Sequence, residues 1–404
     1  MTFLIKFQRI ALYLFFISIN FEMWDPFNSQ NTFSIAKLTA LIYFISIIPQ
    51  FRQFIRIDAL KPVLFPIWIF FGLLTIMSAF NVNELSTEFF YTSIFLNMTF
   101  FWLLINHARK DYLILEKGML SFALGSFALT VLFFAGIGVT YVDKRLSMFG
   151  ENSNVLGVMA SLSTLILLAN AIQNRLNMGW YRYIFVLMIF PMLIFIGESG
   201  SRVAIIAFVM AFLTGTILYK TKSKVGKAGI LIGSAVILIL AGIMLMQSEV
   251  MVQRLENTSN SGEIGSRDRI WKAVFPIIEN NPVLGVGRTG YDFESTFLFG
   301  RPFSPHNVIL EIMCYTGIVG LLIYLYFLFQ VYNTGYQTYK RNGWLLPILL
   351  AIPISGLILS GQILQFKIGW TIFAYIVGSI CAKAYNDKIN YPKRIGTNQV
   401  TSKV

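Results

Sequence analysis

Long apolar runs separated by short polar segments dominate the chain, and most of its roughly dozen runs are 16 to 23 residues long. An α-helix rises 1.5 Å per residue, so about 20 apolar residues cross a hydrocarbon core of roughly 30 Å. The run at 228–246 is apolar on every face, whereas the strands of a membrane β-barrel alternate over about 10 residues. The pattern therefore predicts an all-α polytopic integral membrane protein.

We expect about 12 transmembrane helices, with one long outer, periplasmic loop between the ninth and the tenth. The predicted spans are residues 10–22, 35–50, 62–79, 89–106, 118–140, 154–172, 183–198, 202–219, 228–246, 307–330, 344–361 and 368–382. No small-residue cleavage site follows the first run, so we interpret it as a retained helix and not as a signal peptide. The expected parts are a nine-helix membrane region (1–246), the outer loop (247–306), and three helices with a basic cytoplasmic tail (307–404).

The composition agrees with a membrane protein and excludes several other classes of protein. Hydrophobic residues make up 56% of the chain and charged residues 13%, which excludes a soluble globular protein of this length. The two cysteines, Cys314 and Cys381, lie in apolar runs, so the sequence contains neither a disulfide framework nor a metal-binding spacing. We therefore expect no metal and no cofactor.

The net charge of +13 is explained mainly by topology. With both termini in the cytoplasm, the cytoplasmic segments hold 21 of the 32 Lys and Arg residues, as the positive-inside rule favours. These residues are scattered over short turns, which suits contact with anionic membrane lipids and predicts no nucleic-acid partner.

Eleven basic residues remain on the outer side against that rule. Six lie in the long loop: Arg254, Arg267, Arg269, Lys272, Arg288 and Arg301. Lys144, Arg145 and Arg202 lie in or beside other outer loops. Positive charge kept outside suggests an anionic ligand on that face.

Residues 266–280 of the long loop are predicted to form a short amphipathic helix. Its apolar stripe consists of Ile270, Trp271, Val274, Phe275 and Ile278. Arg267 falls in the middle of this stripe, while Arg269 points the other way. A guanidinium in an apolar face needs an anion or hydrogen-bond acceptors, although Arg267 could instead extend to solvent. The polar stretch 256–265 before this helix is a candidate mobile lid.

Two further features follow in the loop. The glycine-rich segment 283–290 comes after a helix and not a strand, so we expect a close-packed turn and no nucleotide site. His306 lies at the outer end of the tenth helix beside arginines; its unperturbed pKa of about 6.5 suits a general base, with a capping or hydrogen-bonding role as the alternative. The second histidine, His107, is expected to be solvated near the cytoplasm.

Several ordered motifs in the second half of the chain resemble the conserved core of the O-antigen ligase and O-antigen polymerase family. They are Gly265-Ser266-Arg267, Ile270-Trp271, Asn281-Pro282-Val283-Leu284-Gly285-Val286-Gly287, Pro305-His306-Asn307 and Gly317-Ile318-Val319-Gly320. Weaker similarities are Ser201-Arg202, and Arg145 followed by Gly150-Glu151-Asn152-Ser153-Asn154. Members of this family are polytopic glycosyltransferases that act on lipid-linked glycans.

The resemblance implies a metal-independent, inverting glycosyltransferase in the bacterial cytoplasmic (inner) membrane, with its active site facing outward. Its donor would be an undecaprenyl-diphosphate-linked oligosaccharide, and its acceptor a glycan or another lipid-linked molecule. By motif, His306 would deprotonate the acceptor, while Arg202 and Arg267 would bind the donor diphosphate. The remaining candidates for substrate binding are Arg145, Asn154, Arg269, Asn307 and Arg288. Of the nearby acids, Glu151 could pair with Arg145, and Glu311 is expected to be a structural or lumen-facing carboxylate.

Three alternatives stay open. The first is a polymerase that joins polysaccharide repeat units, with a chain-length regulator protein as a candidate partner. A ligase that passes the glycan to a lipid A core of lipopolysaccharide or another acceptor would use the same donor chemistry. A transporter or flippase of lipid-linked oligosaccharide is less consistent with the sequence, because residues 1–200 and 201–404 show no self-similarity. A purely structural scaffold would not explain the outer basic residues.

Overall fold

A computed structural model describes residues 2–27, 29, 34–80, 88–142, 145–219, 224–246, 251–253, 256, 267–361 and 363–382. Of the predicted lid at 256–265, all residues after Glu256 lie outside the described part of the chain, as do Lys144, Arg254, Ser266 and the basic tail.

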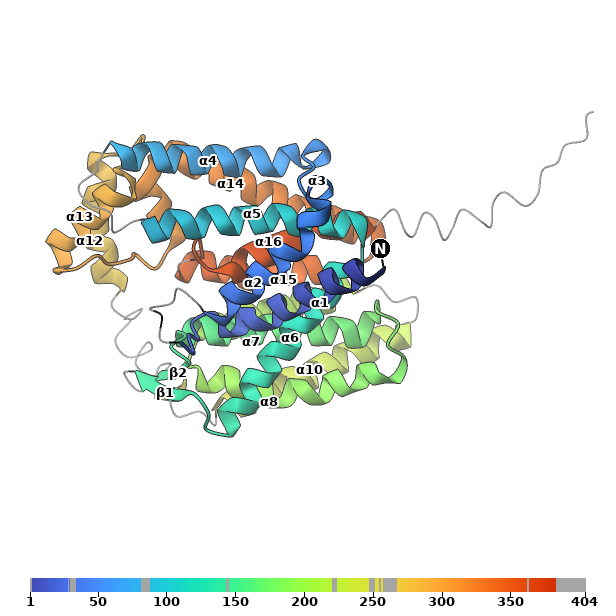
Figure 1. Cartoon of the computed structure of the whole chain (residues 1–404). Helices are drawn as coiled ribbons and strands as arrows, with labels where there is room; N and C mark the ends of the chain where they lie inside the picture. Colours follow the sequence, from blue (N-terminus) through green and yellow to red (C-terminus); the bar gives the residue numbers. More distant parts are fainter. Residues whose placement is uncertain are drawn as a thin grey trace, which may run out of the picture.

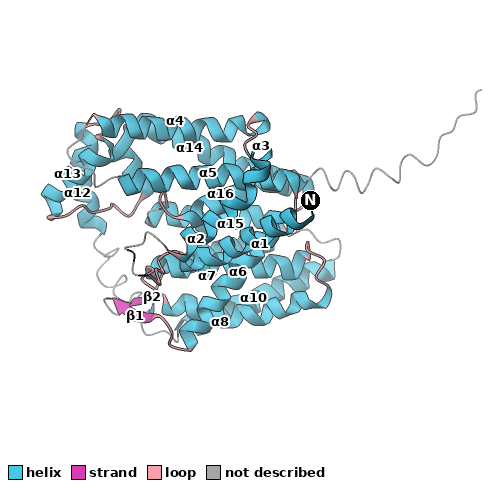
Figure 2. Cartoon of the chain, viewed as in Figure 1, coloured by secondary structure: helices cyan, strands magenta, loops and turns pink. Residues whose placement is uncertain are grey.

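The fold is a bundle of long helices, with one helix at each of the predicted spans (Figures 1 and 2). The helices are α1 (Thr2–Ser18), α2 (Ile35–Ile47), α4 (Lys61–Ala79), α5 (Glu88–Lys110), α6 (Ile114–Phe134), α7 (Ser153–Gln173), α8 (Ile184–Glu198), α9 (Arg202–Leu218), α10 (Lys224–Met246), α14 (Val308–Asn342), α15 (Leu346–Ser360) and α16 (Lys367–Gly378). The short α3 (Phe51–Phe54) follows α2. Within the described residues, seven helices are long and apolar enough to cross a membrane by length and composition. This confirms the predicted class, an all-α polytopic membrane protein, while twelve crossings remain a prediction.

The segment after α6 differs from the prediction. The fifth span was expected to continue to residue 140, but α6 ends at Phe134, and the strands β1 (Val139–Val142) and β2 (Arg145–Met148) form an antiparallel hairpin. Gly136 and Gly138 both adopt positive φ, which ends the helix and turns the chain, and β-branched residues favour the strand that follows.

Between residues 267 and 306, the part of the outer loop that the structure describes continuously, there are two helices where one was predicted. The amphipathic helix is α12 (Arg267–Asn280), in agreement with the prediction, and a second helix, α13 (Gly287–Phe299), follows it. Both pack against the bundle, α12 on α14 and α13 on α4 and α14. In Figure 1, α12, α13 and the hairpin lie at one end of the bundle, opposite the N-terminus.

The first half of the glycine-rich segment, residues 283–286, is a close-packed turn between α12 and α13, as predicted, and it rests on a break in α14. Residues 287–290 instead begin α13. Gly317 has φ +58° and ψ −159° inside α14. There the Val286 N–H donates to the Cys314 carbonyl (2.8 Å), and the Ile318 N–H donates to the Pro282 carbonyl (2.9 Å). The loop therefore satisfies backbone groups that the break in α14 leaves without helical partners.

His107 is not solvated, contrary to the prediction. It is 4% exposed in the last turns of α5, where its Nδ1 lies 3.0 Å from the Tyr43 hydroxyl and its ring stacks on Tyr43. The sequence placed it correctly near the end of a helix, but α2 and α3 cover it. This histidine is part of the packing between helices.

Candidate active site

A cavity of about 270 Å³ lies at the end of the bundle that carries the outer loop. Five of the eight predicted site residues line it: Arg145, Asn154, Arg202, Arg267 and His306. Among the described residues that line the cavity, three are arginines and none is Asp or Glu. The wall is therefore strongly cationic, although the rest of it is largely apolar.

The N-terminal ends of four helices meet at this cavity. Asn152 and Asn154 begin α7, Arg202 and Val203 begin α9, Arg267 and Ile270 begin α12, and Phe366 and Ile368 flank the start of α16; all of them line the cavity. A helix N-terminus carries partial positive charge and backbone N–H groups without helical partners, and both favour anions. The backbone thus adds to the charge of the arginines.

Helix α12 presents Arg267 to the cavity and Arg269 to solvent, as the helical phase predicts. Ile270, Val274 and Ile277 are buried on the bundle side. The half-buried Arg267 guanidinium donates to the Ser360 carbonyl at the end of α15 (2.9 Å), so it does not extend to solvent. Burial lowers the pKa of Arg267, and the nearby charge of Arg202 lowers it further. Two cations are thus held close together, which is unfavourable without an anion.

Arg145 and Asn154 face each other across the turn between β2 and α7. The Arg145 guanidinium donates to Asn154 Oδ1 (2.8 Å), and the side chain of Asn152 caps α7. The carboxylate of Glu151 accepts from the Asn152 N–H (3.0 Å), and burial raises its pKa to about 8. Burial thus disfavours the charged form of Glu151.

His306 lies in the turn before α14, with φ +51°, and its ring contacts Phe303 edge-to-face at 5.7 Å between centroids. Burial lowers the pKa of His306, and the charge of Arg267 lowers it further. The imidazole is therefore neutral at pH 7 and can accept a proton.

Three predicted substrate-binding residues do not line the cavity. Arg269 is exposed on the far side of α12. Asn307 caps α14, because its Oδ1 accepts from the N–H groups of Ile309 (2.9 Å) and Leu310 (3.2 Å). The placement of both residues gives no support to a direct contact with substrate.

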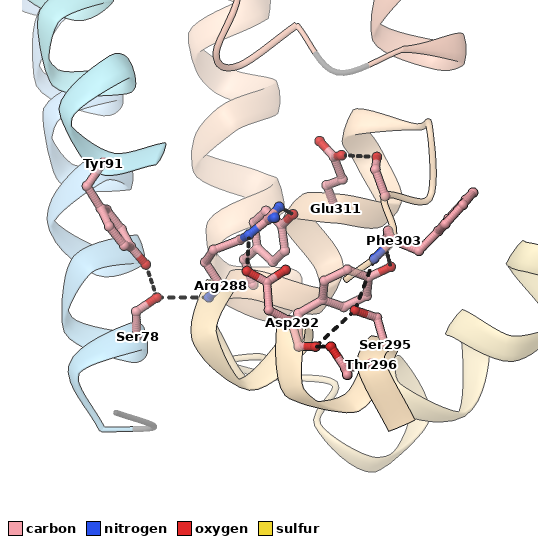
Figure 3. A network of polar contacts seen from close by, with 11 residues as sticks. Ser78, Tyr91, Arg288, Asp292, Ser295, Thr296, Phe303 and Glu311 are labelled. Atoms are coloured by element: carbon pink, nitrogen blue, oxygen red, sulfur yellow. Dashed lines mark hydrogen bonds and ion pairs between the residues drawn. The ribbon is translucent and has the colours of Figure 1, made fainter. Parts of the chain in front are cut away.

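Arg288 belongs to a separate polar cluster between α4, α5, α13 and α14 (Figure 3). Its guanidinium pairs with Asp292 (2.9 Å) and donates to the Tyr315 hydroxyl, while its backbone N–H donates to Ser78 Oγ (2.8 Å). Tyr91 donates to the same Ser78 hydroxyl. Arg288 thus anchors α13 to the bundle.

Some walls of the cavity come from segments that sequence reasoning missed. Leu357, Ser360 and Gly361 come from the end of α15, and Phe366 and Ile368 from the start of α16. These residues are mostly apolar and belong to no motif, so no sequence signal could have identified them. Within the described ranges, no group of three or more His, Cys, Asp or Glu side chains is placed to hold a metal ion.

Together, the fold and this cavity define a polytopic α-helical membrane protein with a cationic site at one end of its bundle. Residues 184–325 match a family model described as O-Antigen ligase (Wzy_C). The chain therefore carries a domain of the O-antigen ligase family, which confirms the resemblance seen in its motifs. A search among curated proteins returns no match.

The matched segment runs from α8 into α14 and includes Arg202, Arg267 and His306, while Arg145 and Asn154 precede it. This family supports a glycosyltransferase-type ligase enzyme in a bacterial membrane, with lipid-linked glycan donor and acceptor substrates, in polysaccharide biosynthesis of the cell envelope.

Proposed function

We propose that the protein transfers a glycan from an undecaprenyl-diphosphate-linked donor to an acceptor hydroxyl at the outer face of the cytoplasmic membrane. The observation that carries this proposal is that three arginines, Arg145, Arg202 and Arg267, line the same cavity as His306. The termini would lie in the cytoplasm. The membrane region would comprise residues 1–246, and the loop that carries the site would comprise residues 247–306. Three further helices and the tail would follow in residues 307–404.

The arginines would bind the donor diphosphate. A guanidinium presents a planar fork of N–H groups that matches phosphate oxygens, and it keeps its charge even when partly buried. When the glycosidic bond to the diphosphate breaks, negative charge develops on the leaving group. Arg202 and Arg267, with Arg145 as a third cation, would stabilise that charge from fixed positions.

His306 would activate the acceptor. As the acceptor hydroxyl attacks the anomeric carbon, the neutral imidazole takes its proton, and the bond to the diphosphate breaks with its electron pair. A single displacement of this kind inverts the configuration at the anomeric carbon. The diphosphate supplies the driving force, so the reaction as proposed needs neither a nucleotide sugar nor a metal.

For the acceptor, we propose a second lipid-linked repeat unit, which makes the protein a polymerase. The second candidate is a ligase, favoured by the description of the matching family model. Transfer accounts for the cavity better than transport does, because the cavity is built at one end of the bundle from loop segments and helix starts.

The test is transfer by purified protein in detergent, with a synthetic undecaprenyl-diphosphate oligosaccharide and EDTA present. Wild type is compared with His306→Ala, and His107→Gln serves as a histidine control far from the cavity. A ladder of longer glycans that His306→Ala fails to make supports a polymerase. Product that requires a separate acceptor supports the ligase. Wild-type rates in His306→Ala would refute the proposal.

A further inference from the structure

Hydrogen bonds from two neighbouring helices hold the turn that carries His306. The Tyr291 hydroxyl, on α13, donates to the Phe303 carbonyl (2.8 Å). The Trp271 indole N–H, on α12, donates to the Pro305 carbonyl (3.0 Å). The turn is therefore fixed on both sides of Ser304, by residues that do not themselves line the cavity.

The backbone of His306 is strained, and a side chain inside the turn holds it. Its φ of +51° lies in the left-handed region that residues with a Cβ rarely adopt. The His306 N–H donates to Ser304 Oγ at 3.0 Å, and Ser304 Oγ donates its own proton to Glu311 Oε1 at 2.6 Å. Because a serine hydroxyl has a single proton, the carboxylate orients it so that a lone pair faces the His306 N–H.

Glu311 is buried in the first turn of α14, 3% exposed. A buried carboxyl group needs hydrogen-bond donors or a nearby positive charge, and Arg288 interacts with it electrostatically. Burial lowers the pKa of Arg288, but Tyr315, Asp292 and Glu311 outweigh this and leave that pKa raised. This gives Arg288 a place in the molecule that its sequence context did not suggest: it supports the carboxylate behind the site.

We propose that Ser304 and Glu311 are positioning residues for His306. The chain from Glu311 through Ser304 to the His306 backbone holds the strained turn in the one conformation that directs the imidazole into the cavity. The inference rests on the proposed function, because only a general base at position 306 requires a fixed position of the imidazole. A general base works only within hydrogen-bond reach of its proton, and a shift of about 1 Å can cost roughly 10²-fold in rate.

The first experiment compares Ser304→Ala, Glu311→Leu and Glu311→Gln. Ser304→Ala removes the hydroxyl that links Glu311 to the His306 backbone, and Glu311→Leu removes the acceptor of that hydroxyl. We expect kcat to fall about 10- to 100-fold in each variant, with the donor KM within about threefold of wild type. Glu311→Gln keeps an oxygen that accepts from Ser304, so it should retain most of the activity. Thr338→Val, a buried hydroxyl at the other end of α14, is the matched control and should match wild type.

A double variant tests whether the two residues act as one chain. Ser304→Ala with Glu311→Leu should cost no more than either change alone, because each already releases the turn. A loss in kcat equal to the product of the two single losses would show that the residues act separately, and it would contradict a single hydrogen-bonded chain.

A second measurement is independent of activity. The protein has two histidines, and modification by diethyl pyrocarbonate, located by mass spectrometry, reports the access of each ring. We expect His306 to react several-fold faster in Ser304→Ala and Glu311→Leu than in wild type, and the buried His107 to stay unreactive in all of them as an internal reference.

The two proposals fail in different ways. An active His306→Ala protein would refute the general base, whatever the state of the turn. An inactive His306→Ala protein, with unchanged kcat in Ser304→Ala and Glu311→Leu, would overturn the positioning role alone. Unchanged reactivity of His306 in both variants would also overturn it, and equal losses in kcat and in the amount of folded protein would show a merely structural role.

Discussion

Replacing Arg267 with alanine tests the diphosphate site most directly, because α12 contains a matched control two residues away. Arg267 lines the cavity, while Arg269 is exposed on the opposite side of the same helix. Arg267→Ala and Arg269→Ala each remove one guanidinium from the same helix. Only the first should affect transfer if position matters and net charge does not.

The size of the effect follows from the surroundings of Arg267. Loss of one preorganised donor to a developing negative charge costs about 10²- to 10³-fold in kcat, or roughly 3–4 kcal/mol. Arg267 is half-buried and fixed on the Ser360 carbonyl, so its field is weakly screened and it needs little reorganisation. Arg202 and Arg145 remain in the cavity and compensate in part. We therefore expect a fall of about 10²-fold, near the lower end of that range.

The assay is the initial rate of glycan transfer by purified protein at saturating donor, with folding checked by size-exclusion chromatography. Arg269→Ala should stay within about threefold of the wild-type rate, because Arg269 does not line the cavity and a surface substitution usually changes stability little. Arg267→Lys should be intermediate, because an ammonium keeps the charge but loses the fork. An Arg267→Ala protein within threefold of wild type, or an equal loss in Arg269→Ala, would refute the diphosphate site.

Three further predictions follow from the described contacts. Transfer should fall on acidification with a midpoint below pH 6.5, because burial and Arg267 lower the pKa of His306 and keep it neutral to lower pH; a pH–rate profile with a midpoint at or above 6.5 contradicts this. Gly317→Ala should destabilise the fold by about 1–3 kcal/mol or more in thermal unfolding, since φ is +58° and a Cβ would overlap the Val283 carbonyl, whereas Gly72→Ala meets no atom and should be tolerated. Arg288→Met should lower the yield of folded protein more than Arg269→Ala does, because it leaves the half-buried Asp292 without its cation.

The membrane helices could be predicted from the sequence because each apolar run is long enough to decide its own structure. The hairpin at 139–148 could not, since its strands have four residues each and directly follow a helical run. Helix α13 was missed for a related reason: it is short and follows a glycine-rich turn whose packing depends on α14. Such elements depend on tertiary contacts more than on local pattern.

The candidate site was predictable where one helix or one turn determines the direction of a side chain. Helical phase separates Arg267 from Arg269, and both lie where it placed them. The motifs do not determine the direction of the side chain of Asn307, which caps a helix, or of Arg288, which pairs with Asp292 four residues later. Neither side-chain contact can be predicted from the sequence without knowing where the neighbouring helices lie.

The break in α14 at Gly317 has a consequence for how the protein is assembled in the membrane. A nascent α14 carries backbone N–H and C=O groups that its own turns cannot satisfy, and lipid offers them no partner. Their partners are in residues 282–286, which the ribosome makes earlier. In the orientation proposed above, these residues must first cross to the outer face, so that completion of α14 would be coupled to translocation of the preceding loop. For the same reason, exchanging that loop for one from another protein would disturb the helix after it as well as the site.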